Sequence, residues 1–294
     1  MNKILFFGAS GRLGSEWIKK LSKCKNDFKV FANIHKTKLP NYDFVKIVKF
    51  NVKNRNSILN FCKQESIDII INCIANTNVE KCEKFPKNAN KINFLIAKNL
   101  CSISKDLKIR YVHISTDMLF DGKIRKKYTE RSKTNPLNIY SKTKLKAEKF
   151  VKKYSKSLIL RTNFFGETNL KKITFSENIL RNREQKIYLW NDIFFNPVHI
   201  KLLISTVNLL IMKKVYGIYN ISSNQCVSKF QLGKMIEKKF FKKSILVENS
   251  FSEKKHTKRP KNMCLSNDKL INKFKSLRNK LNLNTQLKLL KIEY

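Results

Sequence analysis

The sequence predicts an α/β protein built on a Rossmann-like, doubly wound parallel sheet with a smaller C-terminal substrate-binding lid. In its first half, apolar strand-like runs alternate with helical patterns five times. A glycine-rich turn follows the first run, and unusual polar residues follow several others. Parallel strands need long crossover connections, usually helices, so this alternation is typical of a parallel sheet. Because 42% of the 294 residues are hydrophobic, the chain can fill the core of such a fold.

The first strand, turn and helix are expected within residues 3–21. Three glycines with GxxGxxG spacing, Gly8, Gly11 and Gly14, separate the strand from the helix. Gly8 permits a tight turn, Gly11 lets the backbone approach a pyrophosphate, and Gly14 lets the helix lie close to the sheet. The helix is expected to begin near Arg12, with its N-terminal amides directed at the phosphates. These residues predict a dinucleotide-binding turn.

The second strand, residues 28–34, ends at His35 and Lys36. An NAD-preferring site usually has an acidic residue here, which binds the ribose 2′-hydroxyl. Two potential cations and no carboxylate suit a 2′-phosphate instead, so we expect NADPH as the cofactor, with NADH possible. The alternative is that both residues belong to a solvated loop of a lysine-rich protein.

The following elements continue the alternation. A third strand over residues 44–50 leads to Asn51 and Val52, where we expect the adenine to lie. A helix, a fourth strand, a long helix and a fifth strand are expected at residues 55–64, 68–73, 86–104 and 109–114. In a parallel sheet the carboxyl ends of the strands lie at one edge, where ligands bind. The segments expected at this edge are 8–14, 35–36, 73–77 and 115–117.

Candidate catalytic residues follow the fifth strand. Thr116 comes shortly after this strand, in the cluster Ser115-Thr116-Asp117. Tyr140 and Lys144 lie four residues apart on a helix expected to begin near Asn138, so the phenol and the ammonium share one face. A nearby ammonium lowers the pKa of a tyrosine from its usual value of about 10, and a threonine hydroxyl can hold a substrate oxygen in line with the phenol. The trio predicts a proton-donating site for a carbonyl, although a tyrosine–lysine pair at this spacing is also common without catalysis.

After residue 161 the alternation becomes less regular. We expect residues 166–195 to be polar and irregular, and a helix at 199–212 and a strand at 217–221 to return to the core. A helix near 228–240 and a basic tail follow. This pattern predicts a dinucleotide-binding domain over residues 1–165, to which 196–222 return, and a smaller substrate-binding domain over 166–294.

Charge and cysteine content restrict the function classes. The net charge is +41, but lysines are spread along the chain without an arginine-rich arm, so no specific nucleic-acid binding is expected. An odd number of cysteines, seven, without a CxxC pair favours reduced thiols in a cytoplasmic protein over a disulfide framework. Four scattered histidines predict no zinc site. The longest apolar stretch, 200–212, is too short and too often interrupted to span a bilayer, so no membrane insertion is expected.

Motifs along nearly the whole chain are shared with one known group of enzymes. They are GASGRLG at 8–14, NCIANTNVEKCE at 72–83, STDMLFDG at 115–122, PLNIYSKTK at 136–144, RTNFFG at 161–166, GIYNISS at 217–223 and RPKNMCLSNDKL at 259–270. With these motifs the sequence resembles the extended short-chain dehydrogenases, specifically the dTDP-4-dehydrorhamnose reductase-like branch. The resemblance implies an NADPH-dependent reductase of a nucleotide-linked 4-keto-6-deoxy sugar, in dTDP-rhamnose and polysaccharide biosynthesis, that forms a homodimer.

The same resemblance implies a role for individual residues. Thr116, Tyr140 and Lys144 would form the catalytic trio, with hydride transfer to C4, Tyr140 as the general acid and Lys144 also on the nicotinamide ribose. Asn93 would be a structural or proton-relay residue. The cofactor would contact the glycine turn and the end of the fourth strand through Gly8, Ser10, Gly11, Arg12, Leu13, Gly14, Cys73, Ile74 and Ala75. The sugar nucleotide would contact Thr77, Thr116, Phe164 and Arg259.

Several positions depart from the family pattern. Phe164 stands where a tryptophan is frequent, which leaves the identity of the sugar open. Met118 stands where dehydratases of the superfamily usually carry an acid, which argues against dehydration. Glu16 matches one magnesium position of some members, but its partners are missing, so no metal is expected. Two alternatives remain: a nucleotide-sugar epimerase on the same scaffold, and a non-catalytic regulatory subunit of the methionine adenosyltransferase type.

Overall fold

The computed structural model describes residues 2–22, 27–34, 37–168, 173–182, 185–241 and 245–291. Contacts within the chain group it into two compact units. The first unit comprises Met1–Ser115, Ile139–Leu160 and Asn208–Ile218, and the second comprises Thr116–Asn138, Arg161–Val207 and Tyr219–Tyr294. Segment 116–138, expected with the dinucleotide-binding part, therefore groups with the second unit.

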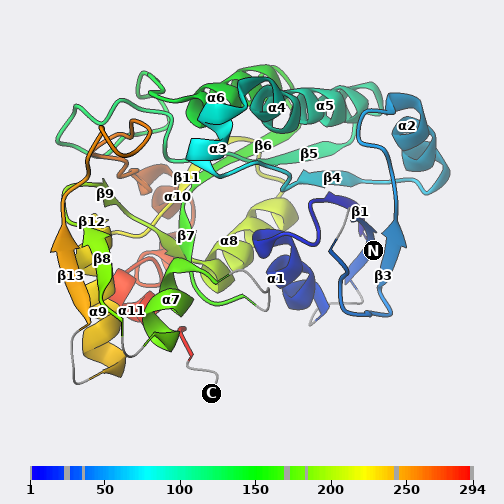
Figure 1. Cartoon of the computed structure of the whole chain (residues 1–294). Helices are drawn as coiled ribbons and strands as arrows, with labels where there is room; N and C mark the ends of the chain where they lie inside the picture. The colour runs from blue at the N-terminus through cyan, green and yellow to red at the C-terminus, as the bar shows by residue number, and fades with distance from the viewer. Residues whose placement is uncertain are drawn as a thin grey trace. The chain divides into compact units, whose positions relative to one another are not determined.

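The central element is a seven-stranded sheet with the order β11-β6-β5-β4-β1-β2-β3 (Figure 1). Its strands are β1 (Asn2–Phe7), β2 (Phe28–Asn33), β3 (Val45–Val48), β4 (Ile69–Asn72), β5 (Arg110–Ile114), β6 (Ser157–Thr162) and β11 (Gly217–Ile221). From β3 to β6 this is the strand order of doubly wound dinucleotide-binding folds. The register is parallel, and Phe7, Asn72 and His113 lie side by side on β1, β4 and β5. The predicted fold class is confirmed.

Helices cover the sheet on both sides because its central strands are apolar on both faces. All four residues of β4 are buried, as expected for a parallel strand between two helical layers. α1 (Arg12–Leu21) lies on one side, and α5 (Ile96–Asp106) and α6 (Ile139–Val151) lie on the other (Figure 1). α2 (Arg55–Gln64) follows β3 and has the predicted bounds. On the α1 side Trp17 packs edge-on against Phe6, with ring centroids 5.3 Å apart.

The predicted helix at 86–104 is divided in the structure. It consists of α4 (Pro86–Asn90), a π-helical turn over Lys91–Leu95, and α5, and it is preceded by α3 (Val79–Lys84). A π turn inserts an extra residue into the helix and is frequently found at functional sites. Propensity along the sequence does not reveal such an insertion.

The second unit contains short strands and helices. They are β7 (Phe164–Phe165), α7 (Phe175–Arg181), β8 (Ile187–Trp190), β9 (Phe194–Phe195), β10 (Val198–His199), α8 (Ile200–Met212), which continues into the first unit, β12 (Val227–Ser228), α9 (Lys229–Phe240), β13 (Leu246–Asn249), α10 (Asp268–Lys273) and α11 (Leu283–Leu287). The strands form three two-stranded sheets, β10-β7, β12-β9 and β13-β8. None of the helices in the described part of the chain is long and apolar enough to span a bilayer.

Two expectations about this unit were wrong. Residues 166–195 are not irregular throughout, because α7 begins with a capping box between Thr174 and Glu177, and β8 pairs in parallel with the distant β13. The cysteines are not all reduced thiols, because Cys226 and Cys264 form a disulfide with a Cα–Cα distance of 5.8 Å. The pairing of β8 with β13 and the disulfide both join segments that are far apart in the sequence.

Candidate active site

The glycine turn connects β1 to α1. Gly8 adopts φ +78°, a left-handed conformation that favours glycine, and a Cβ there would lie 2.9 Å from the backbone of Cys73 and Ile74. A Cβ on Gly14 would lie 2.2 Å from the carbonyl oxygen of Gly8, so only glycine lets the first turn of α1 approach this loop. Gly11 is the N-cap of α1, and no side chain caps this helix end. The backbone therefore forms a compact cradle at a helix N-terminus, which fits a pyrophosphate.

The other predicted cofactor residues are distributed around this cradle. Ser10 and Arg12 are half-buried beside Gly11, whereas Leu13 is buried in the core. Asn51 is exposed after β3, and Val52 packs against the hydrophobic core of the sheet. His35 and Lys36 lie outside the described residues, so the preference for NADPH that rests on them stays a prediction.

The end of β4 carries the next predicted group. Cys73, Ile74 and Ala75 are half-buried, and Thr77 is exposed. The parallel register places Cys73 beside Gly8, at the same edge of the sheet. Burial raises the pKa of the Cys73 thiol far above its usual value, with a smaller opposing effect of the Lys144 ammonium, so Cys73 is a neutral apolar group here.

Asn93 is the centre of a buried hydrogen-bond network. It lies on the π turn, and its Oδ1 accepts the backbone N–H of Asn76 at 2.8 Å. Its Nδ2 donates to the Asn76 carbonyl oxygen at 3.2 Å and to Thr143 Oγ1 at 3.1 Å. Thr143 precedes Lys144 on α6, so Asn93 connects the loop after β4 to the helix that carries the candidate lysine.

Tyr140 and Lys144 are both buried on α6, with 7% and 2% of their surfaces exposed. Lys144 Nζ donates to the carbonyl oxygen of Ile114, at the end of β5, at 2.5 Å. Burial lowers the pKa of Lys144 from 10.5 to about 8, while Cys73 and Glu148 act in the opposite direction. An ammonium with a lowered pKa next to a catalytic candidate is typical of functional sites.

Glu148 is a residue of this site that the sequence analysis missed. It is 3% exposed and lies one turn after Lys144 on α6, and Ser115 Oγ donates to its Oε2 at 2.9 Å. The spacing of Tyr140, Lys144 and Glu148 could have indicated it, because residues at i, i+4 and i+8 lie along one face of a helix. His113 is buried beside them, and burial, with a smaller effect of Lys144, lowers its pKa far below the usual value.

Thr116 and Asp117 begin the second unit. Both are buried, and Thr116 Oγ1 donates to Asp117 Oδ1 at 3.2 Å and accepts the Met118 N–H at 3.2 Å. Asn163 Nδ2 donates to Asp117 Oδ2 at 2.9 Å. Burial raises the pKa of Asp117 to about 6, against the hydrogen bonds from Asn163 and Thr116. The hydroxyl of Thr116 therefore has an orientation set by its neighbours.

The two predicted sugar-nucleotide residues of the second unit differ in their surroundings. Phe164 is half-buried in β7, where it pairs with Val198 of β10. Arg259 is half-buried in the loop between β13 and α10, with its guanidinium carbon 5.1 Å from the centroid of the Trp190 ring. No pattern in the sequence indicates that Trp190 is a neighbour of Arg259.

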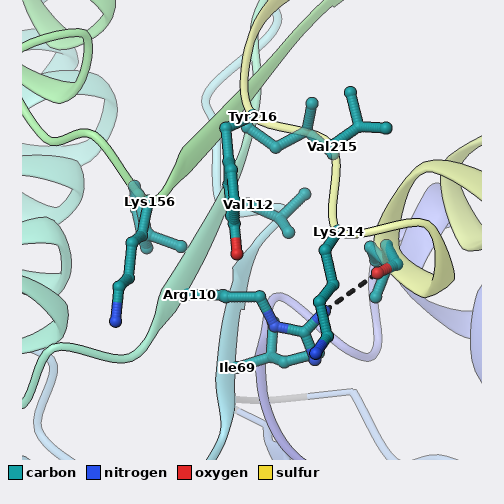
Figure 2. A pocket seen from close by; sticks show the side chains of 10 residues that line it. Ile69, Arg110, Val112, Lys156, Lys214, Val215 and Tyr216 are labelled. Atoms are coloured by element: carbon teal, nitrogen blue, oxygen red, sulfur yellow. Dashed lines mark hydrogen bonds between the residues drawn. The ribbon is translucent and has the colours of Figure 1, made fainter.

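A surface cavity of about 320 Å³ lies away from the glycine turn. Arg110, at the amino end of β5, lines it together with Lys108, Lys156 and Lys214. Figure 2 shows the adjoining inner pocket, where Arg110 Nη1 donates to the Ile211 carbonyl oxygen at 2.9 Å. Arg110 thus satisfies a carbonyl in the last turn of α8. This structural role explains the half-buried cation without a ligand.

Metal ligands do not gather anywhere in the described ranges. No group of three or more His, Cys, Asp and Glu side chains among these residues could hold a metal ion. Glu16, the one position that matches a magnesium ligand of the family, is buried on α1.

Comparisons with known proteins agree with this architecture. Residues 1–289 match one family model, described as the RmlD substrate binding domain. The spore coat polysaccharide biosynthesis protein SpsK of Bacillus subtilis is 28% identical, over 80% of this chain and 78% of that protein. The dTDP-4-dehydrorhamnose reductase of Aggregatibacter actinomycetemcomitans is 26% identical, over 93% of this chain and 94% of that protein.

A solved structure has a similar fold. It is a dTDP-4-dehydrorhamnose reductase of Bacillus anthracis in complex with NADP, with a TM-score of 0.79 and 24% identity. The alignment covers 93% of both chains. At this identity the likeness establishes the fold alone.

Proposed function

Since this chain belongs to the RmlD substrate-binding domain family, we propose that it is an NADPH-dependent reductase of a nucleotide-linked 4-keto-6-deoxy sugar. The observation that carries this proposal is the pair on α6, a buried tyrosine one turn before a buried lysine of lowered pKa. The names of the relatives support the reaction class, because a dTDP-4-dehydrorhamnose reductase aligns with nearly the whole chain. The reaction class is an NAD(P)-dependent oxidoreduction.

The first unit is proposed to bind the cofactor. The backbone cradle formed by Gly8, Gly11 and Gly14 would bind the pyrophosphate, and its close contacts leave no room for larger residues at Gly8 and Gly14. Lys144 would also bind the nicotinamide ribose. When bound there, NADPH supplies the hydride that reduces C4 of the sugar. Binding of the sugar nucleotide is assigned to the second unit, with Thr77 as a further contact from the first.

The proton is assigned to Tyr140. Its phenol would donate to the ketone oxygen as the hydride arrives at C4, and the ammonium of Lys144 would stabilise the resulting phenolate. Thr116 would hold the ketone oxygen in line with the phenol by turning its one hydroxyl proton from Asp117 Oδ1 to the ketone. Asn93 would keep α6 in register with the loop after β4, through its bonds to Asn76 and Thr143. Positioning and electrostatic stabilisation supply the acceleration in this scheme.

Replacing Tyr140 by phenylalanine tests the assignment. We expect kcat to fall on the order of 10²-fold or more, because the general acid is lost. Tyr154→Phe is the matched control, because its hydroxyl donates to the Ile109 carbonyl oxygen at 2.6 Å within the core and has a structural role. The control should lose stability but keep its turnover. Near-normal turnover of Tyr140→Phe would remove Tyr140 from the mechanism.

The substrate is identified with a panel of nucleotide-linked 4-keto sugars, each offered with NADPH and with NADH. The absorbance loss of the reduced nicotinamide is followed, and the product is quantified. Stoichiometric consumption of NADPH supports a reductase, whereas an epimerase recycles its cofactor and consumes none. Recovery of a stoichiometric partner enzyme with no turnover would instead favour a regulatory subunit. A homodimer and a cytoplasmic location also stay predictions, which sedimentation and localisation experiments can test.

A further inference from the structure

Two cations meet at one tryptophan in the second unit. Lys229 Nζ lies 4.4 Å from the centroid of the Trp190 ring, and the guanidinium carbon of Arg259 lies 5.1 Å from it. Trp190 ends β8, Lys229 begins α9, and Arg259 follows β13. Three segments remote in the sequence therefore place two positive charges around one indole.

The positive charges of Lys229 and Arg259 repel each other. Burial and, with a smaller effect, the charge of Arg259 lower the pKa of Lys229 to about 8, and the carboxylate of Asp117 partly opposes them. Lys229 is also the first residue of the twelve-residue α9, where the helix dipole disfavours a cation. Positive potential thus comes from two side chains and a helix end, and this potential attracts a dianionic ligand.

Aromatic packing gives the site a defined wall. Phe251 and His256 pack edge-on against Trp190, with centroids 5.0 and 5.3 Å away. The indole, held by these rings and with two cations near it, is a rigid surface for a ligand that carries both charge and ring systems. A nucleoside diphosphate has these properties.

We propose that Lys229 and Arg259, held against Trp190, bind the diphosphate of the nucleotide-linked substrate. This inference rests on the proposed function and deepens it, because neither Lys229 nor Trp190 follows from the shared motifs. Asp117 connects the diphosphate site to the chemistry, since its carboxylate attracts Lys229 and accepts the hydroxyl of Thr116. Lys229 and Arg259 are binding residues, and Asp117 is a positioning residue.

The test is calorimetric titration of the full chain with dTDP, UDP and inorganic pyrophosphate. Lys229→Met should weaken dTDP binding about 10- to 100-fold, as expected for loss of a charge-assisted contact, and should leave NADPH affinity within twofold. Lys238→Met removes the same charge from an exposed position of α9 and should change neither. Lys229→Arg retains the charge and should keep binding. A thermal melt of each variant verifies that it is folded.

The outcomes separate this inference from the proposed function. If dTDP binding of Lys229→Met and of Arg259→Gln equals that of the parent protein, the diphosphate site is elsewhere, and the reductase assignment is unaffected. If the parent protein binds neither nucleoside diphosphate, the inference is also refuted. If binding falls as expected but no keto sugar is turned over, the site stands and the reductase assignment fails. Pyrophosphate affinity that falls in parallel with dTDP affinity assigns the loss to the phosphates rather than the base.

Discussion

The buried charge of Lys144 is expected to lower the free energy of unfolding of the protein. Burial lowers its pKa from 10.5 to about 8. A shift of this size corresponds to about 3 kcal/mol lost from the free energy of unfolding at neutral pH, at 1.36 kcal/mol per pKa unit. Lys144→Met removes the buried charge but also the hydrogen bond to the Ile114 carbonyl oxygen, which costs about 1–2 kcal/mol. We therefore expect the variant to be more stable than the parent by about 1–2 kcal/mol at pH 7.

The stability cost of the buried Lys144 charge depends on pH. Between pH 8 and 10.5 the unfolded chain binds more protons at this lysine than the folded chain does, so the parent gains stability as the pH rises. By pH 10 less than about 1 kcal/mol of the cost remains, and the advantage of Lys144→Met should disappear.

Urea-induced unfolding at pH 7 and pH 10 measures the difference in stability between Lys144→Met and the parent at each pH. Lys142→Met is the control, because Lys142 is exposed on the same helix and its replacement should change stability by no more than about 0.5 kcal/mol. Turnover of Lys144→Met should fall even though its stability rises. A variant that is less stable than the parent by the same amount at both pH values would refute the reasoning.

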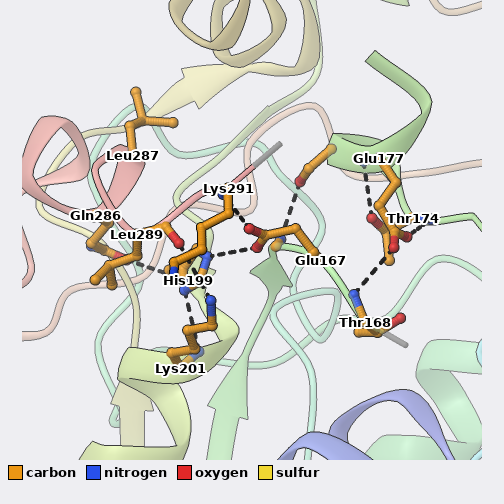
Figure 3. Close-up of polar contacts among 12 residues, drawn as sticks. Glu167, Thr168, Thr174, Glu177, His199, Lys201, Gln286, Leu287, Leu289 and Lys291 are labelled. Atoms are coloured by element: carbon orange, nitrogen blue, oxygen red, sulfur yellow. Dashed lines mark hydrogen bonds and ion pairs between the residues drawn. The ribbon is translucent and has the colours of Figure 1, made fainter. Parts of the chain in front are cut away.

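Two further predictions concern single positions in the two units. Gly14→Ala would place a Cβ 2.2 Å from the Gly8 carbonyl oxygen, so α1 must shift. We expect NADPH affinity, measured by fluorescence titration, to fall several-fold or more, and the Tm to fall as well. Unchanged affinity would contradict the proposed cradle. Glu167 accepts hydrogen bonds from His199 Nε2 and the backbone N–H of Lys291 (Figure 3). Burial raises its pKa, but these bonds together hold it below the usual value. Glu167→Gln should therefore destabilise the protein by about 1–2 kcal/mol at pH 7. This difference in stability from the parent should shrink as the pH falls through the folded-state pKa of Glu167. If thermal melts show the same difference across that pH range, the charge of Glu167 is not involved.

Local patterns in the sequence determined the first unit almost completely. The strand, glycine turn and helix at the start, the helix Arg55–Gln64 and the spacing of Tyr140 and Lys144 were predictable, because each depends on residues within one turn or one strand. Alternation of strands and helices then leaves few ways to arrange a parallel sheet. For the same reason the carboxyl edge with Gly8 and Cys73 could be foreseen.

Only the tertiary structure decided what surrounds the candidate residues. The pairing of β8 with β13, the disulfide between Cys226 and Cys264 and the meeting of Lys229 with Arg259 at Trp190 all join distant segments. The π turn under Asn93 and the burial that lowers the pKa of Lys144 are likewise consequences of packing. Periodicity reports which face of an element is apolar, but desolvation and charge pairing depend on which other element covers that face. For this reason the sequence could name the candidate lysine, Lys144, whereas its free-energy cost and its carboxylate neighbour required the folded chain.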